Sequence, residues 1–413
     1  MTAPVWREFF LGDVVEFLDY KRKPLNSTER ASRQGPYPYY GASGPIDSVD
    51  GYLFDGRFLL VAEDGENLNS RKLPLAFFAT GKFWVNNHAH VIRGIEGIVD
   101  DDFLKHWFAC NSISGYITGA AQPKLSQASM KRISLRLPDY SQQRRIASIL
   151  SAYDDLIENN TRRIAILEEM ARRIYEEWFV RFRFPGHENV RMVQSELGPV
   201  PEGWQERPVL DVAIVHRGRS YKGSELAEEG GRPFVNLKCI ERDGGYRSSG
   251  LKRYTGAFKE SHTVRAGEMV MAVTDMTQER RIVARVGRVG RLDADFGVVS
   301  MDLVRIASRG DFQEAYLYAM FRWSGFADQV KQHANGANVL HLLPARIEEH
   351  VFVCPPAEVA NRFAAVLSPM LSLCDTLEQK NANLRTTRDL LLPKLISGEL
   401  DVSAMPDPEA AAA

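Results

Sequence analysis

The sequence predicts an α+β fold with a pseudo-twofold internal repeat, in which two strand-rich domains are separated by two long coiled-coil helices. The second half of the 413-residue chain repeats landmarks of the first half. Gly119, Pro138 and Arg145 return 217 residues later as Gly336, Pro355 and Arg362, and Trp6 returns 198 residues later as Trp204. Each half also ends in a long stretch with heptad-spaced apolar residues. Repeats of about 20–50 residues build solenoids, so this much longer period indicates two whole domains.

The two domains are expected at residues 1–138 and 204–354, where short apolar runs are broken by Gly, Pro, Asn and Asp. Such runs are typical of strands that end in turns. The runs at 58–62, 83–92, 268–273 and 298–306 predict strands, and short helices are expected at 102–111 and 312–323. Residues 185–203, rich in Pro, Gly and Glu, predict an interdomain linker. Residues 401–413 predict a disordered tail.

Residues 139–184 and 355–400 predict long helices that pair along an apolar seam. The residues expected to pair the helices or dock a partner are Ile146, Tyr153, Asn160, Leu167 and Ile174 in the first, and Phe363, Met370, Leu377, Leu384 and Leu391 in the second. Further seam positions are Ile149, Leu156, Met170, Val366 and Leu373.

Two features predict that the helices are not mirror images. Pro369 lies inside the second helix and predicts a kink, because an interior proline removes a hydrogen bond. Beyond it the repeat lengthens by three residues, so that Glu378 corresponds to Glu158. A three-residue insertion locally overwinds a coiled coil. The polar seam residue Asn160 is of a kind that usually fixes helix register at some cost in stability.

The bulk composition excludes several classes of protein. Hydrophobic residues make up 44% and charged residues 25%, as in ordinary soluble proteins. No apolar run approaches the ~20 residues that span a bilayer, and the N-terminus lacks the pattern of a signal peptide. We therefore expect a cytoplasmic protein, with the four scattered cysteines reduced. The net charge of −1 is unlike that of a simple polycationic nucleic-acid binder, so any DNA-binding charge must be local or supplied by a partner.

Five phrases link the chain to a known family: PYYGASGPID at 38–47, LVAEDG at 60–65, FWVNNHAHV at 83–91, ILSAYDDLIENN at 149–160 and LLPKLISGELD at 391–401. With the tandem order of domain and helix, they make the chain resemble the specificity subunit of type I restriction-modification enzymes. The resemblance implies that each strand-rich domain reads one half of a split site in double-stranded DNA, and that the two long helices pack antiparallel as a spacer. It also implies docking of two methyltransferase subunits, through which restriction subunits join. S-adenosylmethionine, ATP and magnesium would then belong to those partners.

The chain lacks motifs for chemistry of its own, so we expect no catalytic residue, metal or cofactor in it. Gly81-Lys82 lacks the upstream glycine of a phosphate-binding loop, and no Asn/Asp-Pro-Pro-aromatic motif of a methyltransferase occurs. His88 and His90 share a strand face, where two imidazoles can hold a metal. Nothing else clusters with them by spacing, so structural or DNA-facing roles are favoured.

Candidate DNA-contacting residues are basic or polar side chains in loops, because phosphates bind Lys and Arg and base edges bind polar donors and acceptors. They come from a basic run, a glycine-rich loop, the repeated Gly-Ala segment and two basic stretches of the second domain. They are Lys21, Arg22, Lys23, Tyr39, Tyr40, Ser43, Gln122, Lys124, Arg217, Arg219, Lys222, Thr274, Gln278, Arg280, Arg281 and Arg285.

Two other functions stay open from the sequence. The near-neutral charge suits a protein-interaction scaffold without DNA readout. A self-sufficient DNA methyltransferase or nuclease is the weaker alternative, because the motifs for its cofactors are missing.

Overall fold

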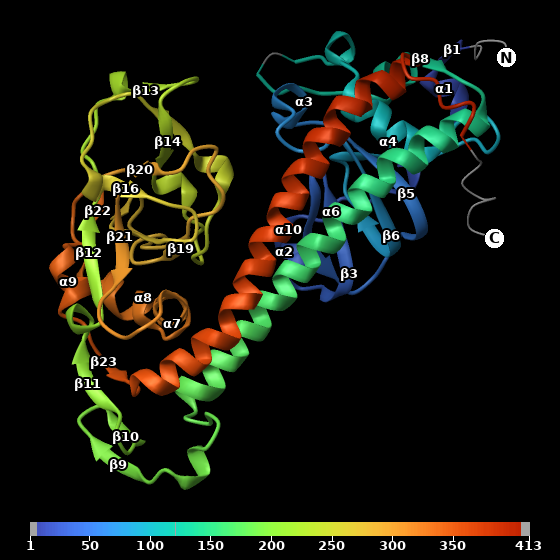
Figure 1. Ribbon diagram of the computed structural model, residues 1–413. Coiled ribbons are helices and arrows are strands. Elements are labelled where there is room, and N and C mark those ends of the chain that lie inside the picture. The colour runs from blue at the N-terminus through green and yellow to red at the C-terminus, as the bar shows by residue number, and fades with distance from the viewer. Residues whose placement is uncertain (1–5, 120, 406–413) are drawn as a thin grey trace. The chain divides into compact units, whose positions relative to one another are not determined.

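The computed structural model describes residues 6–119 and 121–405, which form two compact units (Figure 1). Unit 1 comprises Met1–Glu158 and Ala382–Ala413, and unit 2 comprises Asn159–Asn381. Both combine strand-rich sheets with segments of two long helices, α6 (Tyr140–Tyr175) and α10 (Ala357–Ser397). The predicted α+β class is confirmed.

Unit 1 is built on a six-stranded sheet in the order β2-β7-β5-β6-β3-β4. The second half of its central strand β5, residues Phe58–Ala62, is apolar and buried, and contributes to the core of the unit. The described elements are β1 (Arg7–Phe10), α1 (Leu11–Val14), β2 (Val15–Phe17), η1 (Asp19–Lys21), α2 (Ser27–Ala31), β3 (Gln34–Gly41), β4 (Gly44–Val49), β5 (Phe54–Ala62), α3 (Asn67–Ser70), β6 (Ala76–Val85), β7 (Ala89–Gly94), α4 (Asp101–Cys110), η2 (Ser114–Tyr116), α5 (Gln127–Lys131) and β8 (Ser134–Leu137).

Unit 2 holds a four-stranded sheet, β12-β21-β17-β19, and a five-stranded sheet, β13-β15-β14-β20-β16. Its strands are β11 (Gln205–Pro208), β12 (Ala213–Arg217), β13 (Leu226–Ala227), β14 (Arg232–Val235), β15 (Lys252–Tyr254), β16 (Thr263–Val264), β17 (Met269–Ala272), β18 (Thr274–Asp275), β19 (Val286–Arg288), β20 (Gly297–Val299), β21 (Leu303–Ser308), β22 (Leu340–His341) and β23 (Val351–Cys354). Its shorter helices are η5 (Val209–Asp211), η6 (Gly223–Glu225), η7 (Leu237–Cys239), η8 (Ser248–Gly250), η9 (Glu260–His262), α7 (Glu314–Trp323), α8 (Phe326–Val330), η10 (Lys331–His333) and α9 (Pro344–Glu348).

The sequence repeat is also a repeat of backbone hydrogen bonds. In unit 1, β1 pairs with β8 and the Leu11 N–H donates to the Ile133 carbonyl over 2.8 Å. In unit 2, β11 pairs with β23 and the Val209 N–H donates to the His350 carbonyl over 2.9 Å. The strand order β2-β7-β5 of one sheet likewise matches β12-β21-β17 of the other. The two strand-rich parts therefore share a common framework.

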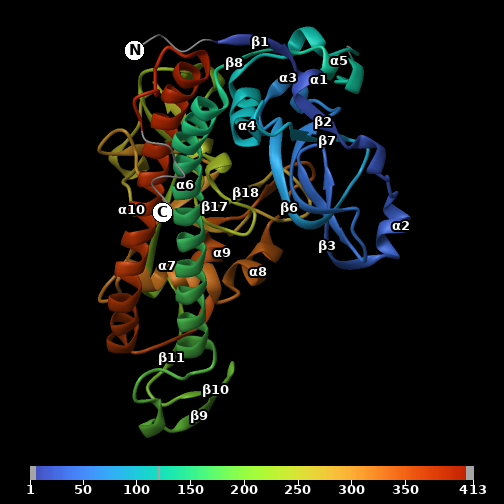
Figure 2. The same cartoon turned by 90° about the vertical axis from the view of Figure 1, so that its right-hand side faces the viewer.

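In each unit, a segment of α6 lies beside a segment of α10 (Figure 2). Ile146 packs in the core of unit 1, with Leu391 partly buried against it. In unit 2, Phe363 is buried in the core, with Ile174 and Met370 partly buried around it. Of the other predicted pairing residues, Asn160 and Leu377 are buried, whereas Tyr153, Leu167 and Leu384 are half-buried.

Part of the predicted seam is wrong. Leu156, Met170, Val366 and Leu373 are exposed, and Leu150, Ala171, Tyr175 and Leu367 are buried on the two helices. A straight helix has 3.6 residues per turn, so its buried face drifts away from a strict heptad. α10 also continues through Pro369 without interruption.

The segment predicted to be a plain linker is folded. β9 (Met192–Ser195) and β10 (Gly198–Pro201) pair as a hairpin. In the chain they follow η3 (Glu176–Val180) and η4 (His187–Asn189). Phe184 and Val200 pack with Trp204 in a small core of their own. The predicted disordered tail starts too early, because Val402 is buried against unit 1. Residues 406–413 lie outside the described part of the chain.

Candidate nucleic-acid interface

The basic run of the first domain divides into exposed and structural residues. Lys21 and Lys23 are exposed on either side of Arg22. The Arg22 guanidinium donates to the Glu63 carboxylate and to the Ala89 carbonyl, each over 2.7 Å, and forms an ion pair with Asp19 at 3.4 Å. Its nitrogens are engaged inside the domain, and the assignment of Arg22 to DNA stays a prediction. Lys21 and Lys23 stay candidates.

A network of hydrogen bonds around Asp19 and the buried His90 lies next to this basic run in the sequence. His90 is buried, with Nδ1 2.7 Å from the Asp19 carboxylate and Nε2 2.7 Å from the Leu125 carbonyl. Burial opposes ionisation of Asp19, but the hydrogen bond and charge of His90, the Val91 N–H and the charge of Arg22 together hold its pKa below the usual value. Gln127 also donates to Asp19 over 3.0 Å. His90 is thus structural, as favoured from the sequence.

The residues that flank the repeated Gly-Ala segment make the same backbone hydrogen bonds in both units. Thr118 and Lys124 exchange two backbone hydrogen bonds of 2.8 Å, and Asn335 and His341 exchange a matching pair of 3.0 and 2.9 Å. Each loop is then tied to the end of a central strand. The Leu125 N–H donates to the Glu63 carbonyl over 2.7 Å, and the Leu342 N–H to the Val273 carbonyl over 2.8 Å.

Glycine is required at the first residue of each loop. Gly119 has φ +86° and Gly336 has φ +152°. A Cβ on Gly119 would clash with the Gln122 carbonyl oxygen, and one on Gly336 with the Val339 carbonyl oxygen. This shared construction presents Gln122 and Lys124 as exposed side chains in unit 1. The Lys124 ammonium lies 3.3 Å from Glu63 yet keeps 54% of its side chain exposed.

The glycine-rich loop contributes less than predicted. Tyr39 is buried, and its hydroxyl accepts from the Leu25 N–H over 2.8 Å, so its assignment to DNA stays a prediction that its burial does not favour. Tyr40 is half-buried against Phe77 and Phe83, and burial raises its pKa. Ser43 is exposed in the turn between β3 and β4 and stays a candidate.

In unit 2, the first basic cluster lies at the end of β12. Arg217 and Lys222 are exposed. Arg219 is half-buried and its Nε donates to the Ala257 carbonyl over 3.0 Å. All three stay candidates for phosphate contact.

In the densest basic stretch of the chain, several side chains make hydrogen bonds within unit 2. Arg280 donates to the Gln332 side chain over 3.2 Å, Arg285 to Asp328 over 2.9 Å, and Gln278 to the Ala337 carbonyl over 3.0 Å. Arg280 and Arg285 thus have partners within unit 2, and their DNA roles stay predictions. Thr274 is buried beside His341, and its DNA role also stays a prediction. Arg281 is exposed, with Glu279 at 2.8 Å.

Tyr20 and Lys238 are both exposed but were not among the DNA-contacting residues predicted from the sequence. Tyr20 stands next to a predicted lysine, with the Lys21 ammonium 5.6 Å from its ring centroid, and is 74% exposed. An aromatic residue directly before a run of cations was a usable signal. Lys238 lies in a segment with no motif, and only the fold reveals its position.

The helices are joined by polar contacts within each unit. The buried Asn160 amide donates to the Asn381 carbonyl oxygen over 2.9 Å in unit 2. In unit 1, Asp154 accepts from Lys105 over 2.5 Å and from Arg388 over 2.6 Å. These cations outweigh burial and hold the pKa of Asp154 below its usual value.

The described residues contain neither a metal-binding cluster nor a helix suited to cross a membrane. Within residues 6–119 and 121–405, no group of three or more His, Cys, Asp or Glu is arranged to hold a metal ion. Over the same residues, no helix has the length and apolar character to cross a membrane.

Comparison with known proteins identifies similar sequences and a similar fold. Residues 5–169 match the type I restriction modification DNA specificity domain. The chain is 24% identical over 364 residues to the specificity subunit of the type I restriction enzyme MjaIX of Methanocaldococcus jannaschii, covering 84% of this chain and 80% of that one. A putative type I restriction enzyme specificity subunit of Haemophilus influenzae is 37% identical over 143 residues, or 34% of this chain and 36% of that one.

The crystal structure of the S subunit of a type I restriction-modification system from M. genitalium has the same fold. It superposes with a TM-score of 0.63 at 12% identity and covers 96% of this chain and 97% of that chain.

Proposed function

The chain is a specificity subunit of the type I restriction-modification family, and from this premise we propose that it reads a bipartite DNA target, with one half-site for each unit. The observation that carries the proposal is the duplicated loop. Residues 118–124 and 335–341 keep the same hydrogen bonds and the same glycine requirement but carry different side chains. Two segments with the same backbone hydrogen bonds and different side chains are suited to recognising two different DNA sequences.

The side chains proposed to contact DNA in unit 1 are exposed and surround the buried network. Phosphate contacts are assigned to Lys21, Lys23 and Lys124, and polar contacts to Ser43 and Gln122. In unit 2 the corresponding cations are Arg217, Arg219, Lys222 and Arg281. Because few cations serve each half-site, much of the affinity should come from partner subunits.

We further propose that α6 and α10 dock two methyltransferase subunits, through which restriction subunits join. Exposed apolar residues on these helices, such as Leu156 and Met170, support this assignment because exposed apolar patches often mark protein interfaces. Catalysis, with S-adenosylmethionine, ATP and magnesium, is assigned to the partners and not to this chain.

The test is methylome sequencing of cells with and without this chain, both containing the methyltransferase subunits. The proposal predicts a split methylation motif that depends on the chain. An unchanged methylome would favour a scaffold without DNA readout. Methyl transfer by the isolated chain would favour a self-sufficient enzyme.

A further inference from the structure

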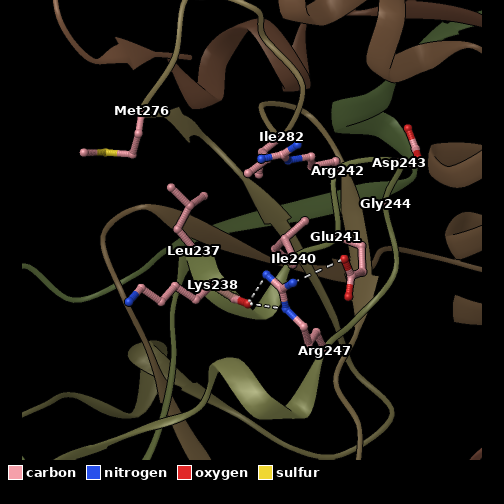
Figure 3. A pocket seen from close by; sticks show the side chains of 10 residues that line it. All are labelled: Leu237, Lys238, Ile240, Glu241, Arg242, Asp243, Gly244, Arg247, Met276 and Ile282. Carbon is pink, nitrogen blue, oxygen red and sulfur yellow. Dashed lines mark hydrogen bonds and ion pairs between the residues drawn. The ribbon is translucent and has the colours of Figure 1, made fainter. Parts of the chain in front are cut away.

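A cavity of about 730 Å³ lies in unit 2 beside η7 (Figure 3). Its walls combine the cations Lys238 and Arg242 with apolar side chains, among them Leu237, Met276 and Ile282. Figure 3 shows Met276 and Lys238 extending toward the same side, with Leu237 between them. Met276 is 65% exposed, an unusual position for a large apolar side chain.

The internal repeat relates this cavity to a predicted DNA-facing turn of unit 1. β3 runs parallel to β6 with Tyr39 opposite Trp84, and β14 runs parallel to β20 with Phe234 opposite Val298. The next residue in each case accepts a matching backbone bond. The Tyr40 carbonyl accepts from Asn86 over 3.1 Å, and the Val235 carbonyl accepts from Ser300 over 2.8 Å.

Counting three residues onward from Tyr40 and Val235 reaches Ser43 and Lys238. The exposed serine of the unit 1 turn thus corresponds in position to the exposed lysine of the cavity. The two domains carry little sequence likeness here, so only the matched strands reveal the correspondence.

The cations of the cavity are available for a ligand. Over the described part of the chain, neither the Lys238 ammonium nor the Arg242 guanidinium makes a hydrogen bond or ion pair. The neighbouring Arg247 is occupied, since it donates twice to the Lys238 carbonyl over 3.1 Å and lies 3.6 Å from Glu241. Arg247 therefore holds the backbone of Lys238 in place.

We infer that this cavity reads base edges of the half-site assigned to unit 2, an inference that rests on the proposed function. Lys238 and Arg242 suit the acceptor atoms of guanine in the major groove, and Met276 suits the methyl group of thymine. Asp243, also on the wall, suits the amino group of cytosine. Free cations, a carboxylate and an exposed apolar side chain together fit duplex DNA better than a purely apolar or purely acidic partner.

The experiment determines the methylation motif produced by the full chain with its methyltransferase subunits. The variants are Lys238→Gln, Arg242→Gln and Met276→Ala, with Arg346→Gln as a control that removes an exposed cation from α9 of the same unit. We expect relaxed base preference at one or two positions of one half-site, and roughly tenfold weaker binding of the wild-type site. The other half-site and the control should be unchanged.

Three outcomes would overturn the inference. An unchanged motif in all three variants, with a chain-dependent motif in wild type, rejects the cavity but leaves the proposed function intact. Loss of assembly with methyltransferase subunits at an unchanged motif assigns the cavity to a protein partner. A wild-type methylome that does not depend on the chain rejects both proposals. Thermal melting of each variant checks that folding is preserved.

Discussion

Asn160 of α6 and Asn381 of α10 are buried and hydrogen-bonded to each other over 2.9 Å in unit 2. The Asn381 amide also donates to the Thr161 hydroxyl over 3.2 Å. A buried amide has partners in only one register of two helices, so this contact selects one alignment of α6 against α10.

The amide pair predicts a specific double-mutant cycle. Asn160→Leu removes the hydrogen bond that the Asn381 side-chain oxygen accepts and should destabilise the protein by about 1–3 kcal/mol. The double variant Asn160→Leu with Asn381→Leu should recover most of that loss, because neither residue leaves an unpaired amide. Chemical denaturation of the four proteins measures the coupling. Additive effects of the two substitutions would show that the amides do not act as a pair.

The glycine of the unit 2 loop, Gly336, predicts a loss of methylation when it is replaced. Gly336→Ala places a methyl group against the Val339 carbonyl oxygen and should distort the unit 2 loop. We expect methylation of the target to fall at least tenfold while binding to the methyltransferase subunits persists. Gly310→Ala is the matched control, since Gly310 also has a positive φ of +72° but has open space at its Cβ. Equal losses in both variants would mean that backbone strain alone explains the effect.

Two cations of unit 1 should behave differently. Lys124→Gln should leave stability unchanged and reduce the salt dependence of DNA binding by about one counterion. Arg22→Gln should lower stability by about 1–3 kcal/mol, since it leaves the Glu63 carboxylate less well paired. Salt titration of DNA binding and thermal melting distinguish these results. If Arg22→Gln kept full stability but reduced the salt dependence of DNA binding, Arg22 would be assigned to DNA contact.

Unit 1 should lose stability in mild acid because of His106. Burial, with the charge of Lys105, lowers the pKa of this imidazole to about 4. The unfolded chain has the ordinary pKa of about 6.5, so it binds more protons than the folded chain between these values. Stability should therefore fall as pH drops from about 6.5 to about 4, by a few kcal/mol at most. His106→Gln should flatten this part of the pH profile; an unchanged profile would refute the assignment.

The sequence predicted the fold through features that repeat. Gly119 and Gly336 marked the two loops, and the structure places the same hydrogen bonds around both. The helices at 102–111 and 312–323 appear as α4 and α7 within one or two residues of the expected ends. Because each of these features occurs twice in the chain, it could be recognised by comparing its two copies.

The sequence does not reveal side-chain partners that lie far along the chain. Arg22 is one of three consecutive cations, and nothing nearby indicated that Glu63 would bind it. Tyr39 and Tyr40 are adjacent in β3 at a shift of the β3–β4 register, and the sequence does not say which of the two is buried. The partners of Arg280 and Arg285 were missed for the same reason, because Gln332 and Asp328 approach them only in the folded domain.

Domain exchange measures the central claim most directly. Residues 204–353 would be replaced by the corresponding domain of another specificity subunit, and the methylome of cells carrying the chimera would be sequenced. Independent reading by two units predicts a motif in which one half-site changes and the other keeps its bases and spacing. A motif changed in both halves would contradict it.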